Sequence, residues 1–139
     1  MAFNQNSKYL EDNILNWLKG TAFPAAPSGL YLGLMTTAPT ASNATGTEAS
    51  YTGYARQAVT LGSLAGTTAL GSGDSASSTA QVTFPTNNSG STVTVQSFAL
   101  FDAATAGNML VMEEPASAVN IPNGTALQFN AGQVTVTQI

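Results

Sequence analysis

The chain has 139 residues, of which only ten are charged: three lysines and arginines against seven aspartates and glutamates. It contains no histidine and no cysteine, which excludes disulfides, thiol chemistry, Cys/His zinc sites and histidine-based acid–base catalysis. A net charge of −4 argues against a nucleic-acid partner, because Lys and Arg contacts to phosphates supply most of that affinity.

The chain begins with a segment, Met1–Asn6, whose side chains are uncharged and rich in Asn and Gln. It has no apolar run of the kind that an export signal needs, so we expect synthesis in the cytoplasm. A segment of this composition can form hydrogen bonds to a neighbouring molecule. We therefore expect Met1–Asn6 to be an arm that lies along another subunit.

One helix is predicted, from Lys8 to Lys19. Ser7 can cap its first turn, and Gly20 is placed to end it. Apolar residues follow at helical spacing between these two: Leu10, Ile14, Trp17 and Leu18. A tryptophan on such a stripe belongs more often to a core than to a ligand site, so we expect Trp17 to be buried.

After Pro24 and Pro27 the sequence reads as strands separated by turns. Leu30–Met35 is apolar on both faces and is expected to be a central strand. The other predicted strands are Tyr54–Leu61, Ala80–Phe84, Val93–Phe101, Met109–Glu113, Ala118–Ile121, Thr125–Phe129 and Val134–Thr137. Two stretches of small residues, Ala38–Ser50 and Gly62–Ser78, are interpreted as surface loops.

About eight short strands and one short helix predict a mainly β fold, an antiparallel β-sandwich of jelly-roll type. We expect a single domain over residues 1–139, with the arm and the helix in residues 1–20. No membrane span is predicted, since the longest charge-free segment, Pro115–Ile139, is interrupted by Pro122 and Gly124.

The few carboxylates do not form a recognisable catalytic or metal site. Glu113 and Glu114 are adjacent, and neighbours on a strand point to opposite faces, so the two cannot work as a pair. Asp74 and Asp102 stand alone in their loops, where a calcium site needs several oxygen ligands. We therefore predict no catalytic residue, no cofactor and no metal, and a protein that is not an enzyme.

Arg56 is the one cation between Lys19 and the end of the chain. It could bind an outside partner from its strand beside Tyr54. The interpretation we favour is internal pairing with a carboxylate or with carbonyls, because the guanidinium fork suits partly buried bidentate contacts.

Short motifs spread over nearly the whole chain carry a resemblance: Tyr31–Met35, Thr36–Pro39, Gly46–Glu48, Gly53–Val59, Val82–Pro85, Phe101–Ala104, Gly107–Leu110 and Ala131–Gly132. They resemble a family of small tailed-bacteriophage virion proteins, and Gly53–Val59 is the most specific part. Members are labelled tail-fibre proteins, and related β-sandwich proteins are trimeric cement or decoration proteins on capsids. The sequence departs from the family at Asn88–Gly90, where Trp-Gly is expected. The resemblance implies no catalytic residues.

The resemblance implies a place in the virion, with synthesis in the host bacterial cytoplasm. The leading hypothesis is a capsid decoration (cement) protein that binds the major capsid protein as a homotrimer. The alternatives are a tail or tail-fibre component that binds other tail proteins, and a module for host surface glycans that uses Tyr51, Tyr54 or Trp17 for stacking. The sparse charge fits either a neutral surface or, as we favour, one covered by neighbouring subunits.

Overall fold

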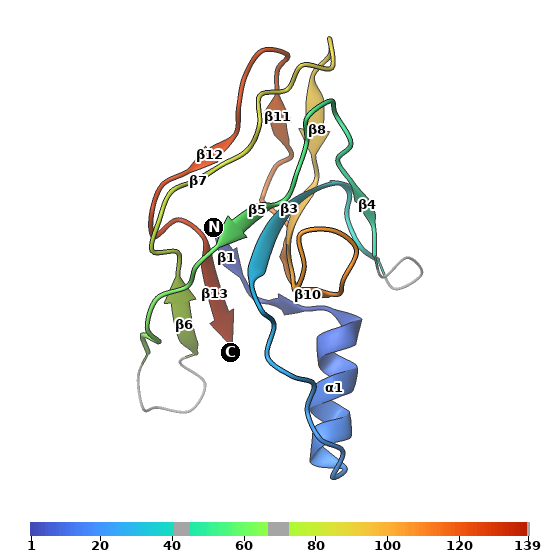
Figure 1. Ribbon diagram of the computed structural model, residues 1–139, viewed down its shortest axis with the longest axis vertical. Coiled ribbons are helices and arrows are strands. Elements are labelled where there is room, and N and C mark those ends of the chain that lie inside the picture. The colour runs from blue at the N-terminus through green and yellow to red at the C-terminus, as the bar shows by residue number, and fades with distance from the viewer. Residues whose placement is uncertain (41–44, 67–72, 139) are drawn as a thin grey trace.

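The computed structural model describes residues 1–40, 45–66 and 73–138. Figure 1 shows a body made of strands and one helix, α1 (Lys8–Leu18), that extends away from the body. The pair of strands β8 (Val93–Val95) and β11 (Val119–Ile121) lies at the opposite end of the molecule. The predicted mainly β, sandwich-like fold with a short N-terminal helix is confirmed.

The largest sheet runs through the middle of the body. Its strands lie in the order β2 (Gln5–Asn6), β10 (Met109–Glu113), β9 (Ser97–Phe101), β3 (Leu30–Thr37) and β4 (Thr47–Glu48), and β5 (Gln57–Val59) also pairs with β3. All these pairings are antiparallel. The long apolar segment expected to form a central strand is therefore central, as predicted.

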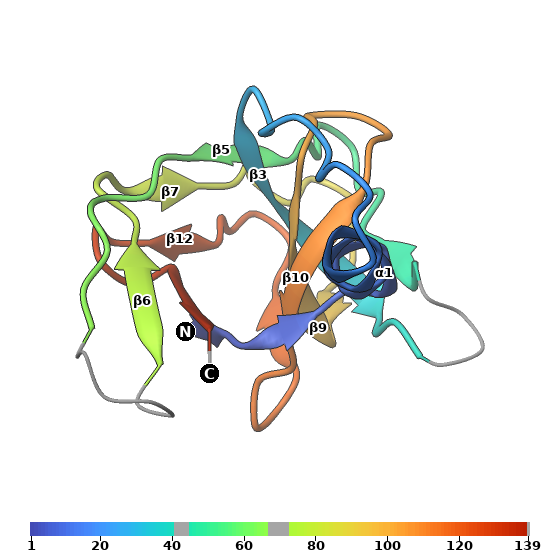
Figure 2. The same cartoon turned by 90° about the horizontal axis from the view of Figure 1, so that it is seen from below.

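Smaller sheets complete the body. One is three-stranded, in the order β1 (Ala2–Phe3), β13 (Thr135–Gln138) and β6 (Asp74–Ser77), and the pair β7 (Val82–Thr83) and β12 (Gln128–Phe129) forms another. Figure 2 shows β5, β7 and β12 on one side of the molecule, with α1 seen end-on at the other side. The two chain ends meet in the three-stranded sheet, where β1 and β13 run parallel.

Successive side chains of a strand point to opposite faces of the sheet, and in the central sheet both sets include buried apolar residues. The sheet therefore has a buried cluster on each face. The main core contains Leu32 and Leu34 of β3 together with Phe98 and Leu100 of β9. The opposite face carries a second buried cluster made of Met35, Ala99, Phe101, Met109 and Met112. The second cluster lies beneath the segments that carry Glu48 and Arg56, and the Arg56 guanidinium packs on its Phe101 ring.

The predicted strand boundaries are right for Met109–Glu113 and differ elsewhere. The predicted strand Val93–Phe101 is two strands that belong to different sheets and part at Gln96. Within the two stretches interpreted as loops, β4 and β6 are strands, which corrects that interpretation for these residues. Residues 41–44 and 67–72 of those stretches lie outside the described residues.

The N-terminal segment, which the sequence led us to expect as an arm on another subunit, pairs with strands of its own chain. Ala2 and Phe3 pair with β13, and Gln5 and Asn6 pair with β10 of the same chain. Phe3 is fully buried in the main core. The earlier expectation was wrong because the side-chain composition of Met1–Asn6 says nothing of the two sheet edges that its backbone completes.

The helix is capped as predicted and buried less than predicted. Ser7 Oγ accepts a hydrogen bond from the backbone N–H of Leu10 at 3.2 Å, and Gly20 follows the last turn with a φ of 93°. None of the helical residues is buried, however, and Trp17 is 58% exposed. The expectation that Trp17 lies in the core is therefore wrong: only the first turns of α1 reach the body. The described helix is too short and too polar to cross a bilayer.

Candidate assembly surface

Arg56 lies in a buried polar network that joins three separate segments. Its Nε and one terminal nitrogen donate to the two carboxylate oxygens of Glu48, both at 2.8 Å. The other terminal nitrogen donates to the carbonyls of Ala103 and Ala106 at 2.8 and 2.7 Å. The guanidinium lies 3.4 Å above the centre of the Phe101 ring. The predicted internal pairing of Arg56 is confirmed, and its side chain is only 8% exposed.

Two backbone features make room for this network. Gly33 lies beside the ring of Phe101, and a Cβ atom at this position would come within 2.8 Å of the ring. Ala106 has a φ of 53°, a left-handed conformation that most residues avoid, and its carbonyl faces the guanidinium. The absence of a side chain at Gly33 and the backbone conformation at Ala106 therefore have a packing explanation that needs no ligand.

Tyr54 completes the network from the other side of Glu48. Its hydroxyl donates to Glu48 at 2.7 Å and accepts from the backbone N–H of Leu34 at 3.0 Å. Burial raises the pKa of Tyr54 well above its ordinary value. Burial also acts to raise the pKa of Glu48, but the hydrogen bonds from Arg56 and Tyr54 outweigh it, so that pKa is lowered. Glu48 is therefore held in its charged form.

A groove of about 430 Å³ adjoins this network, lined by residues 48–51, 54–56 and 104–106. Its charged groups, Glu48 and Arg56, already bind each other. The two tyrosines named for the glycan-binding alternative make contacts within the chain: Tyr51 donates to the carbonyl of Pro85, and Tyr54 stacks on Phe84. Tyr51 and Tyr54 are therefore wrong as glycan platforms, because their rings pack inside the protein. Trp17 is the one of the three that is exposed.

The carboxylates do not converge. Asp102 accepts hydrogen bonds from the backbone and side chain of Asn108 at 2.7 and 2.8 Å, which closes the loop that follows β9. Glu113 is the last residue of β10 and is partly buried, whereas Glu114 follows the strand and is exposed. Among the described residues, no group of three or more acidic side chains is placed to hold a metal ion.

Glu113 gives a testable pH dependence. One of its carboxylate oxygens is buried and has no hydrogen-bond partner among the described residues. Burial raises the pKa of Glu113, while the backbone N–H of Ala2 acts in the opposite direction with less effect. Because the folded state prefers the neutral acid, the charged form of Glu113 costs stability near pH 7.

We expect Glu113→Gln to unfold at a higher urea concentration than the wild type at pH 7. That advantage should shrink as the pH falls to about 4, where the wild-type carboxyl becomes neutral in both states. The exposed neighbour supplies the control, Glu114→Gln, which should not change the urea midpoint. A Glu113→Gln protein less stable than the wild type at pH 7 would show that the charge is favourable where it lies.

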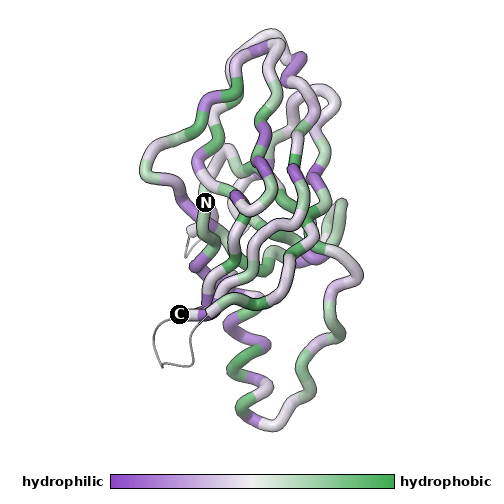
Figure 3. Tube along the Cα trace, turned by 90° about the vertical axis from the view of Figure 1, so that its left-hand side faces the viewer, coloured by the Kyte–Doolittle hydropathy of each residue, from purple (hydrophilic) through white to green (hydrophobic). Residues whose placement is uncertain are grey.

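Four of the five exposed large apolar side chains among the described residues lie on the projection, the name used here for α1 with the segment 19–29 that follows it. Leu15, Trp17 and Leu18 are 59%, 58% and 69% exposed, and Phe23 is 47% exposed. Figure 3 shows the projection leaving the body as two neighbouring segments with apolar residues along both. An apolar patch at the end of a protruding element is typical of a protein–protein contact.

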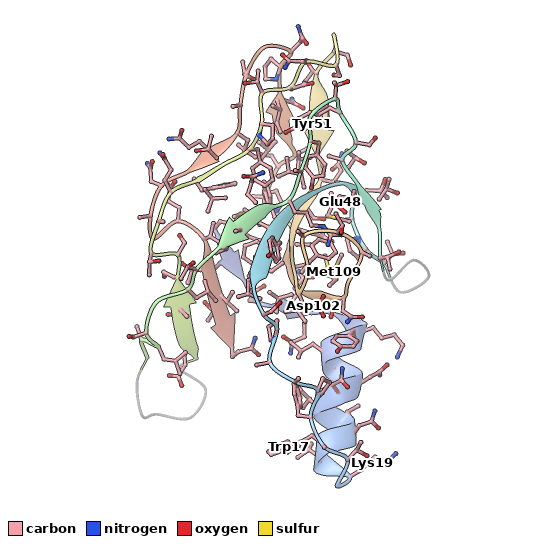
Figure 4. The ribbon with its side chains drawn as sticks, in the orientation of Figure 1. Trp17, Lys19, Glu48, Tyr51, Asp102 and Met109 are labelled. Atoms are coloured by element: carbon pink, nitrogen blue, oxygen red, sulfur yellow. The ribbon has the colours of Figure 1, made fainter. Side chains whose placement is uncertain are left out.

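A second groove lies where the projection joins the body. This base groove has a volume of about 420 Å³ and is lined by Asn6, Ser7, Lys8, Glu11, Pro39, Thr40, Met109 and Met112. The body holds the start of the helix firmly here, since Ser7 bonds to the backbone of β10 through both its N–H and its hydroxyl. Figure 4 shows Met109 in the body above the helix, and Trp17 and Lys19 at the far end.

Comparison with known protein families indicates the kind of protein to which this chain belongs. Residues 5–137 match a family described as podophage GP4 fiber I protein gp80. The chain belongs to this family. The gp80 match covers the body and the projection alike, and it confirms the resemblance to phage virion proteins. No curated protein sequence is similar enough to count as a match.

Membership in the gp80 family makes this protein a structural component of a bacteriophage virion. Sequence reasoning found the residue at the centre of the buried network, Arg56, but not its partner Glu48, which lies in a stretch interpreted as a loop. It also missed the exposed apolar surface on α1. The signal that could have indicated this surface is the segment 20–29, which follows the helix and contains no charge to solvate its end.

Proposed function

We propose that this protein is a non-enzymatic component of the tail fibre, where it assembles as a homotrimer and binds other tail proteins. The observation that carries the proposal is the match over residues 5–137 to a family described as a fibre protein. That description favours the tail-fibre alternative over the capsid decoration that the sequence put first.

The chemistry of the described residues supports a structural role. The most buried charged group, Arg56, is bound by Glu48 and by two backbone carbonyls, and Asp102 is bound by Asn108. These groups hold loops in place and are saturated by partners within the chain. The surface left to interact with other molecules is apolar and amide-rich, which suits permanent contacts between virion subunits.

The number of copies in each virion tests the proposal. Purified virions are digested, and the protein is quantified by mass spectrometry against the major capsid protein with labelled peptides of both. A fibre component should be present in a small number of copies compared with the capsid protein. A copy number comparable to that of the capsid protein would indicate capsid decoration and would overturn the fibre proposal.

A further inference from the structure

The apolar end of the projection has unusual electrostatics for an exposed element. The whole projection contains four charged residues, Lys8, Glu11, Asp12 and Lys19, and its net charge is zero. Lys8 and Asp12 bind each other at 2.7 Å across one turn of the helix. Within the described part of the chain, Glu11 and Lys19 form no salt bridge. Copies of the projection therefore do not repel each other, and each carries one positive and one negative group without an ionic partner.

These two groups lie at opposite ends of α1. Glu11 is in the first turn and lines the base groove. Lys19 caps the last turn, next to Trp17 and Leu18. Glu11 and Lys19 are eight residues apart, a rise of about 12 Å along the helix axis, and they form no salt bridge within the described chain. An ion pair between them requires a second copy.

The base groove suits the apolar end in size and chemistry. Its volume of about 420 Å³ lies in the range of clefts that enclose large side chains or small molecules. Met109 and Met112 lie on its floor, and methionine side chains adapt their shape to an incoming group. Glu11 stands at the rim, where the charged end of an inserted lysine can stay close to water.

We propose that the base groove binds the end of α1 from a second copy of this chain. Trp17 and Leu18 of one copy enter over Met109 and Met112 of the other, and Lys19 meets Glu11 at the rim. The proposal does not depend on where the protein lies in the virion, since both contact surfaces belong to this chain.

The area of one contact is small, so a stable assembly requires that each copy makes two contacts at once. Four partly exposed apolar side chains offer on the order of 400 Å² of surface on each projection. One contact therefore buries about 800 Å² in total over its two sides, about half the size of a standard interface, and each copy takes part in two such contacts. A head-to-tail contact of this kind closes into a ring when the rotation permits it, and a trimer is one such ring.

The mass of the purified full-length protein in solution tests the proposal, by size-exclusion chromatography with light scattering. The wild type should be a closed oligomer at micromolar concentration. The double variant Trp17→Gln/Leu18→Gln should weaken association at least about 100-fold and elute as a monomer, because two apolar side chains leave the contact. Both positions are exposed and glutamine is a good helix former, so the variant should keep the wild-type circular dichroism spectrum and urea midpoint.

A matched control comes from an exposed leucine outside the projection. Leu64 is 78% exposed, so Leu64→Gln removes a similar apolar surface from another part of the molecule. This variant should have the mass of the wild type. A monomeric wild type would overturn the proposal, as would an oligomer unaffected by the substitutions at Trp17 and Leu18.

Charge reversal tests the pairing of Lys19 with Glu11. Lys19→Glu and Glu11→Lys should each weaken association by about fivefold at low salt, since an exposed ion pair contributes up to ~1 kcal/mol. The double variant Glu11→Lys/Lys19→Glu restores opposite charges across the contact and should recover most of the affinity. Two single effects that simply add in the double variant would place Lys19 and Glu11 apart and overturn this orientation of the contact.

Discussion

Replacing Arg56 with alanine should lower the free energy of unfolding by about 3 kcal/mol, because it leaves Glu48 charged, partly buried and without its cation. The variant also removes the donor to the carbonyls of Ala103 and Ala106. Glu48 keeps 27% of its side chain exposed, which places the expected loss at the lower end of the range for a broken buried pair. Urea unfolding followed by circular dichroism measures the change.

The other ion pair of the described chain supplies the matched control. Lys8 and Asp12 are 69% and 53% exposed, and surface pairs of this kind contribute ~0.5 kcal/mol or less. Lys8→Ala should therefore leave the urea midpoint nearly unchanged. Equal effects of Arg56→Ala and Lys8→Ala would contradict the structural role assigned to Arg56.

Acid should weaken the same network. The folded-state pKa of Glu48 is lowered, so its contribution to stability is complete above the unfolded value of about 4.3 and is lost as the pH falls through the folded value. The wild type should therefore lose stability below about pH 4 in part through Glu48. Glu48→Gln should flatten this part of the pH profile.

Replacing Phe3 with alanine should cost about 3–5 kcal/mol, the usual range for a fully buried phenylalanine that leaves a cavity. Phe3 is the side chain through which the N-terminal segment enters the main core. The prediction separates a segment that belongs to the fold from an arm that orders only on a neighbouring subunit. Urea unfolding of the purified protein, without virions, measures the change.

The control for Phe3 lies two residues further on. Gln5 is exposed, and its backbone pairing with β10 is kept when the side chain is shortened. Gln5→Ala should change the free energy of unfolding by less than ~0.5 kcal/mol. If Phe3→Ala had the same free energy of unfolding as the wild type, the N-terminal segment would not contribute to the core and would be an external arm instead.

The features predicted well from the sequence are those determined by residues close to one another along the chain. Ser7 and Gly20 set the two ends of α1, and the apolar run of Leu30–Met35 predicted a strand buried on both faces. Turn residues separated most of the predicted strands, although both bounds agree only for Met109–Glu113. In each case the signal and the structure that it specifies lie within a few residues of each other.

The features missed depend on pairing between distant segments. β1 and β2 have two residues each, too few to show a period, and their partners β13 and β10 lie more than a hundred residues away. Arg56 was expected to bind a carboxylate, yet nothing in the sequence selects Glu48 among seven acidic residues. Trp17 was misplaced because the apolar stripe on α1 is continuous, although only its first turns meet the body.

The central claim is that this chain is a fibre component of the virion whose projection is covered by another subunit. A cryo-electron microscopy map of the intact virion, with this structure fitted to it, tests both parts at once. We expect density that fits this protein at the tail, with the end of α1 enclosed in the base groove of a second copy. Density for the fold distributed over the head, with α1 surrounded by solvent, would contradict it.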